Sequence, residues 1–187
     1  MPRYAWLAAS LLAVACSSGD DAVPPGSTVS TDGPAAGGDL DDISRYELTM
    51  ERMDRIYAAQ RNIALAIRDM TPAEREAMET TGGGSATLAE FARGIESNPK
   101  IRQAIADAGM SPREYATATM AMVSASMAAS ALHMRPTENQ DSLAREMHAN
   151  PANVRFLREN EAELARKQEQ LDTELREAGA LDDDPAR

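Results

Sequence analysis

A charge-free stretch in the second half of the chain restricts the folds that are open to it. Residues 115–134 carry no acidic or basic side chain except His133, and most of them are alanine, methionine, serine or threonine. Ser111-Pro112-Arg113-Glu114 directly before them has the pattern of a helix N-terminus closed by a capping box. A helix that is apolar on all sides is typical of a buried core. We therefore expect a central helix that other elements cover.

The same stretch is about as long as a transmembrane helix, so this alternative has to be weighed. Its apolar residues are mainly alanine and methionine, and hydroxyl residues interrupt them. Such a composition gives weak hydropathy for insertion into a bilayer. Small side chains instead allow close approach of neighbouring helices, and methionine fills the remaining gaps. A core helix is the preferred interpretation.

The rest of the chain has the periodicity of amphipathic helices. Apolar residues recur every three or four positions from Ile43, which predicts one helix of about 28 residues. Another stripe from Val154 to Leu175 predicts a second helix of about 28 residues that ends near Gly179. Shorter helices are expected after Thr71, at 87–96, at 98–108 and at 138–148, and no window has sustained strand alternation. The sequence predicts an all-α helical bundle over 43–179, with an Ala/Met-rich central helix between two long amphipathic helices.

The first residues have the pattern of an export signal. Arg3 precedes an apolar run of about a dozen residues that ends in small side chains, which is typical of a secretory signal peptide. The run is too short to span a bilayer as a stable helix. Ala13 and Ala15 satisfy the small-x-small rule, so cleavage is expected between Ala15 and Cys16. Residues 1–15 are therefore assigned to a signal peptide.

The end of this signal, Leu12-Ala13-Val14-Ala15-Cys16, resembles the lipobox of bacterial lipoprotein precursors, with Ala13 where leucine is commonest. The resemblance implies that Cys16 becomes the first mature residue and carries acyl chains. It also implies sorting to the outer membrane, facing the periplasm, because Ser17 rather than aspartate follows the cysteine. Ordinary cleavage at the same bond would instead leave Cys16 as a free thiol or in an intermolecular disulfide. Several acyl chains anchor a protein stably to a membrane.

Residues 16–42 are rich in glycine, proline, serine and aspartate. This composition predicts a disordered tether, since it offers little apolar surface to bury. The aspartate spacing does not match a calcium loop, so solvated side chains are expected. Residues 180–187 are assigned to an acidic tail. The net charge is −11 for the full chain and −12 without the signal, which argues against a nucleic-acid partner.

Few residues are suited to chemistry. His133, Met134, Met147 and His148 could converge if the short helix folds back, and such ligands suit copper(I) or haem iron. Core packing and helix-end placement explain the same residues more simply, so no metal and no cofactor is expected. Two histidines and a lipid-blocked cysteine offer little for nucleophilic catalysis, and no enzyme activity is expected.

The expected function is a non-catalytic helical binding or scaffold domain in the cell envelope, tethered to the membrane through its lipid anchor. A protein partner or self-association through the amphipathic stripes is possible. The alternative is a periplasmic protein that binds a small ligand, a metal or haem, or misfolded proteins. The Asn-Pro and Ser-Pro-Arg-Glu-Tyr openings resemble uncharacterised exported bacterial proteins, which implies no activity. An open cleft beside Met120 and Met127 would favour the alternative.

Overall fold

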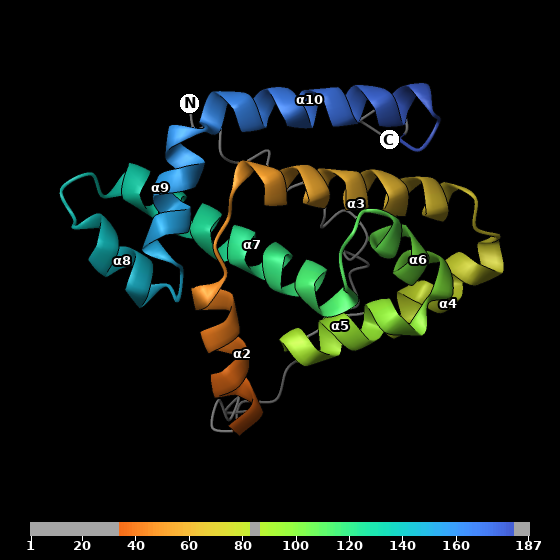
Figure 1. Ribbon diagram of the computed structural model, residues 1–187, viewed down its shortest axis with the longest axis horizontal. Coiled ribbons are helices and arrows are strands. Elements are labelled where there is room, and N and C mark those ends of the chain that lie inside the picture. Colours follow the sequence, from red (N-terminus) through yellow and green to blue (C-terminus); the bar gives the residue numbers. More distant parts are fainter. Residues whose placement is uncertain (1–33, 83–86, 182–187) are drawn as a thin grey trace, which may run out of the picture.

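The computed structural model describes residues 34–82 and 87–181 (Figure 1). This part of the chain contains nine helices and no strand, which confirms the all-α class. In chain order the helices are α2 (Pro34–Arg45), α3 (Met50–Arg68), α4 (Pro72–Gly82), α5 (Leu88–Ser97), α6 (Pro99–Asp107), α7 (Pro112–Met134), α8 (Gln140–Glu146), α9 (Pro151–Glu159) and α10 (Glu161–Glu177). The signal, its cleavage site at Ala15 and Cys16, and residues 182–187 of the tail lie outside the described residues.

Helix α7 is the centre of the bundle, as the sequence predicts. It packs against α2, α3, α5, α6, α8 and α9, while α10 lies along the outer side of α3 (Figure 1). The buried side of α7 consists mostly of alanine, which lets the surrounding helices approach closely. Its fully covered alanines are Ala116, Ala118, Ala121, Ala125, Ala128 and Ala129.

The expectation that α7 is covered on every side is wrong for one face. Val123, Met127 and Met134 are 41%, 57% and 77% exposed, and Met120 is only partly buried. The neighbouring helices cover the alanine side, since small side chains permit the closest packing there. The predicted role as core filler is therefore wrong for Met127 and Met134, whereas Met120 does pack against the core.

The two long helices of the prediction are each divided into two. Residues 46–49 separate α2 from α3, and the Thr49 hydroxyl caps α3 by accepting from the Arg52 N–H at 3.2 Å. At the other end of the chain, Asn160 separates α9 from α10, and its side chain donates to the Phe156 carbonyl at 2.8 Å. The chain turns at Asn160, and α10 then lies beside α3 and runs in the same direction (Figure 1).

Helix α2 extends into the region that was assigned to the tether. Asp39 is 9% exposed, and its carboxylate accepts from the Ala89 N–H at 3.3 Å and from Arg113 at 3.5 Å. Asp42 pairs with the same arginine at 2.8 Å. Both were expected to be solvated, which is wrong for Asp39, while Asp42 remains exposed. Asp39 links α2 to the N-terminal ends of α5 and α7, and Asp42 adds an ion pair to α7.

Candidate functional site

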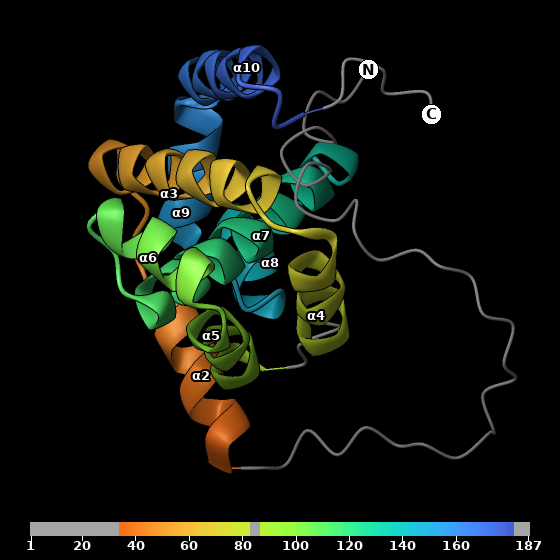
Figure 2. The ribbon, with the colours of Figure 1, turned by 90° about the vertical axis from the view of Figure 1, so that its right-hand side faces the viewer.

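Among the described residues, the feature that most resembles a ligand-binding site is a cavity of about 470 Å³ beneath α4. It lies between the second half of α3, helices α4, α5 and α6, and the start of α7. Figure 2 shows α4 standing beside the main body of the bundle. The apolar residues that line the cavity are Ile63, Ile67, Met70, Met78, Phe91, Ile95 and Ile101. A cavity of this size with a mainly apolar lining is typical of small-molecule sites.

The sharp corner between α5 and α6 shapes one wall of the cavity. Thr87 and Glu90 form a capping box that starts α5. Asn98 then ends α5 and caps α6, since its Oδ1 accepts from the N–H groups of Lys100 and Ile101 at 3.0 and 3.2 Å. Pro99 occupies the first turn of α6, where its missing N–H costs nothing. The corner brings the apolar sides of both short helices to the same cavity.

Gly94 lies inside α5 on the cavity wall. Positions 91, 94, 95 and 98 share one face of the helix, and all four line the cavity. A Cβ at Gly94 would meet no heavy atom within 4 Å outside its own helical backbone. Glycine within a helix costs about 0.5–1 kcal/mol relative to alanine, so its presence here is unfavourable for the helix alone. A glycine in the middle of a predicted helix is therefore the signal in the sequence that could have indicated the cavity.

Tyr115 supplies the buried polar group of the site. It belongs to the first turn of α7, is 3% exposed and lines the cavity. Burial raises the pKa of Tyr115 to about 12. A hydrogen bond with Thr119 acts in the opposite direction, and the phenol stays neutral at physiological pH.

An ion pair between Glu74 and Lys100 links α4 to α6 at the edge of the cavity. The Lys100 Nζ lies 2.9 Å from Oε1 and 3.0 Å from Oε2 of Glu74. The Thr71 N–H donates to the same carboxylate at 2.7 Å, so the capping residue of α4 also holds Glu74 in place. The hydrogen bond from Lys100, followed by those from Thr71, lowers the pKa of Glu74 to about 2.

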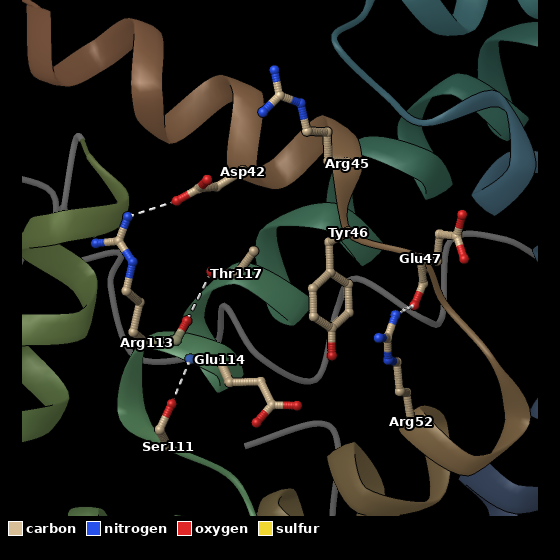
Figure 3. Close-up of a pocket in the computed structure, with 9 residues that line it drawn as sticks. All are labelled: Asp42, Arg45, Tyr46, Glu47, Arg52, Ser111, Arg113, Glu114 and Thr117. Carbon is tan, nitrogen blue, oxygen red and sulfur yellow. Dashed lines mark hydrogen bonds and ion pairs between the residues drawn. The ribbon is translucent and has the colours of Figure 1, made fainter.

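A second hollow, of about 510 Å³, lies between α2, the connector to α3 and the start of α7 (Figure 3). Ion pairs engage several of its charged side chains: Arg113 with Asp42 at 2.8 Å, and Glu114 with Arg55 at 3.4 Å. Arg52 stacks over the Tyr46 ring at 4.8 Å and donates to the Glu47 carbonyl. These contacts hold α2 and the connector against α7.

The same hollow places the Tyr46 hydroxyl toward the space between Glu114 and Arg52 (Figure 3). Burial, and then the charge of Glu114, raises the pKa of Tyr46. A catalytic acid or base works best when its pKa lies near the operating pH. The shift moves the pKa of Tyr46 further above neutral pH, so the phenol stays protonated. The arrangement therefore favours a structural role over acid–base chemistry.

The four residues considered for metal or haem lie at the ends of α7 and α8. His133 and Met134 are exposed in the last turn of α7, Met147 packs against the core, and His148 is exposed with φ 53°. Helix α8 folds back beside α7 (Figure 1). None of the four lines the cavity beneath α4. Within residues 34–82 and 87–181, no group of three or more His, Cys, Asp or Glu side chains is placed to hold a metal ion.

Among the described helices, none combines the length and apolar character needed to cross a bilayer. No protein-family model, curated protein or solved structure matches the chain.

Proposed function

We propose that this protein is a non-catalytic binding domain of the cell envelope, tethered through lipid on Cys16, and that it binds a small apolar molecule beneath α4. The observation that supports this function is the cavity of about 470 Å³ with its largely apolar lining. Of the two functions expected from the sequence, the proposal favours the binding of a small ligand over a purely structural scaffold.

The lining defines the chemistry of the ligand. Ile67, Phe91 and Ile95 offer an apolar surface on both sides of the cavity, suited to an aromatic or aliphatic body. Burying a charge against such walls is costly without a partner, and Tyr115 is neutral there. We therefore infer an uncharged, mainly apolar ligand.

Gly94 allows the cavity to be filled without disturbing the fold. Leucine at this position would project from the cavity wall into open space. Replacing the helical glycine should also stabilise α5 by up to about 1 kcal/mol. Gly38→Leu is the matched control, because Gly38 lies inside α2 with equally open surroundings and does not line the cavity.

The test uses N-phenyl-1-naphthylamine, an uncharged aromatic probe with one N–H group, and residues 16–187 carrying Cys16→Ser. This chain has no tryptophan, since the only one is Trp6, so probe fluorescence is read against a low background. We expect saturable one-to-one binding, at least tenfold weaker in Gly94→Leu and unchanged in Gly38→Leu. Absence of saturable binding, or equal binding in the two variants, would contradict the proposal.

The lipid anchor needs its own measurement. Intact mass of the chain recovered from membranes should show Cys16 as the first residue, with acyl chains attached. Cys16→Ser should move the protein to the soluble fraction, because several chains are what make anchoring stable. An unmodified Cys16 would remove the anchor from the proposal and leave the cavity test unaffected.

A further inference from the structure

Four polar residues that line the cavity beneath α4 are gathered at one part of its edge. Glu74 and Lys100, which form the ion pair between α4 and α6, have side chains that are 42% and 43% exposed. Ser97 and Asn98 also line the cavity, at the corner between α5 and α6, and Lys100 lies two residues after Asn98. The ion pair brings this corner and α4 together. We call these four residues the mouth of the cavity.

The interior of the cavity is mainly apolar. The buried residues that line it are Met70, Ile95, Ile101 and Tyr115, and three of these four are apolar. Burial of an apolar part of a ligand there is favourable, because it removes apolar surface from water. A polar group of the ligand would lose hydrogen bonds to water in the interior, so it is better accommodated at the mouth. The cavity is therefore suited to an amphiphile, a molecule with an apolar tail and a polar head.

The ion pair at the mouth is able to bind hydroxyl groups. The Lys100 Nζ donates to Glu74 at 3.0 Å, and the N–H and hydroxyl of Thr71 donate to the same carboxylate at 2.7 and 3.0 Å. An ammonium group has three donors and a carboxylate has about four acceptor sites, so both groups retain capacity for a further hydrogen bond. A head with two hydroxyl groups can accept from Lys100 and donate to Glu74 while the pair stays intact.

Charge disfavours an ionised head. The acid and the base at the mouth balance each other, so the mouth has no net charge to attract one. A carboxylate head would compete with Glu74 for Lys100, and an ammonium head would compete with Lys100 for Glu74. Thr71 also holds Glu74 in place, which makes the existing pair harder to displace. The net charge of −11 on the chain repels anionic heads further.

We infer that the cavity beneath α4 binds a single-chain amphiphile with an uncharged hydroxyl head, of the monoacylglycerol class. The hydrocarbon tail lies in the interior, and the head lies at the mouth against Glu74 and Lys100. A volume of about 470 Å³ is in the lower part of the range for small-molecule sites, which suits one hydrocarbon chain rather than two. This inference rests on the proposed ligand-binding function and names the class of ligand, and it does not depend on the anchor at Cys16.

Competition with N-phenyl-1-naphthylamine tests the class of ligand. 1-Decanoylglycerol and methyl decanoate share the same acyl ester and differ in the two hydroxyl groups. Decanoate, decyltrimethylammonium and decylphosphocholine carry a chain of the same length with an anionic, a cationic and a zwitterionic head. With every ligand below the concentration at which it aggregates, 1-decanoylglycerol should displace the probe at least tenfold more effectively than the other four, because hydrogen bonds to charged groups are strong.

The order of the ligands decides the outcome. Methyl decanoate is less soluble in water than 1-decanoylglycerol, so a cavity that recognises apolar surface alone would bind the methyl ester more tightly. That order would overturn the inference. Equal or tighter binding of a charged or zwitterionic ligand would overturn it as well.

A pair of lysine variants tests the role of the mouth. Lys100→Met removes the ammonium group and keeps an apolar side chain. It should weaken 1-decanoylglycerol at least tenfold and leave the affinity for methyl decanoate unchanged. Lys167→Met is the matched control, because it breaks the 2.6 Å ion pair with Asp54 between α10 and α3 and does not line the cavity. Equal effects of the two variants on 1-decanoylglycerol would contradict a head bound at Lys100.

Calorimetry of 1-decanoylglycerol without the probe separates this inference from the proposed function. We expect saturable heat that is lost in Gly94→Leu and reduced in Lys100→Met, and this result supports the inference whether or not the probe binds. If the probe binds as proposed and 1-decanoylglycerol gives no saturable heat, the cavity remains a ligand site and the inferred class of ligand is wrong. If neither binds, the inference and the proposed function both fail.

Discussion

The side-chain amide of Asn153 donates to the Tyr46 carbonyl oxygen at 2.8 Å, and its Oδ1 accepts from the Leu48 N–H at 2.8 Å. Asn153 is 1% exposed, so both hydrogen bonds are shielded from water. They join α9 to the connector between α2 and α3, more than a hundred residues away in the sequence. Buried backbone groups need partners, and Asn153 provides them where the connector has no helical partner of its own.

Asn153→Ala should destabilise the fold by about 2–4 kcal/mol, because it leaves the Leu48 N–H and the Tyr46 carbonyl without their strongest partner. Urea unfolding followed by helical circular dichroism measures the loss. Asn139→Ala is the control, since Asn139 is exposed and caps only the short α8, and it should cost about 1 kcal/mol. Equal losses would mean that the connector does not depend on Asn153.

The helix starts could be predicted from sequence because capping is local. Thr87, Asn98 and Ser111 were each expected to open a helix, and each does so by accepting from backbone N–H groups two or three residues ahead. The donor and acceptor lie within one turn, so the residue pattern alone contains the information.

The helix breaks and the pairings between distant segments could not be predicted in the same way. The apolar stripes continue through residues 46–49 and through Asn160, so periodicity gave no sign of either turn. Asp39 resembled a tether residue because its partners, Ala89 and Arg113, are distant in the sequence. The cavity likewise needs four helices and the start of α7 to be assembled. Composition could not show which face of α7 its neighbours would leave uncovered.

Asp39→Ala should loosen the attachment of α2 to the bundle. The Asp39 side chain is 12% exposed and its carboxylate accepts from both α5 and Arg113, so its loss removes the buried polar contacts of α2 and leaves only the exposed Asp42–Arg113 pair and apolar packing. Hydrogen exchange measured by mass spectrometry should show faster exchange in α2, with α7 and α10 unchanged. Asp41→Ala removes only an exposed pair with Arg45 and should change stability by less than about 0.5 kcal/mol. Similar exchange in the two variants would contradict the anchoring role.

Stability should fall at alkaline pH because of two buried phenols. Burial raises the pKa of Tyr57 and of Tyr115 to about 12, and the Tyr57 hydroxyl donates to the Leu164 carbonyl at 3.3 Å. A raised pKa means that this stability is complete below the unfolded value near 10 and is lost as pH rises through about 12. Urea midpoints at pH 8, 10 and 11.5 should therefore decline. The decline should be smaller in a Tyr57→Phe, Tyr115→Phe variant, and an identical decline would exclude these phenols as the cause.

The Glu74–Lys100 pair should govern how quickly a ligand enters the cavity. A lowered pKa means that the stabilising contribution of Glu74 is complete above its ordinary value near 4.5, and is lost as pH falls through about 2. The link between α4 and α6 should therefore persist through mildly acidic conditions.

Glu74→Gln keeps an acceptor for the Thr71 N–H and removes the charge that attracts Lys100. We expect faster hydrogen exchange in α4, together with faster association and dissociation of N-phenyl-1-naphthylamine in stopped flow and little change in affinity. Lys100→Gln should have the same effect, and the double variant should add nothing further, because both substitutions break one interaction. Additive effects would show that the two side chains act separately and that their pair does not control access to the cavity.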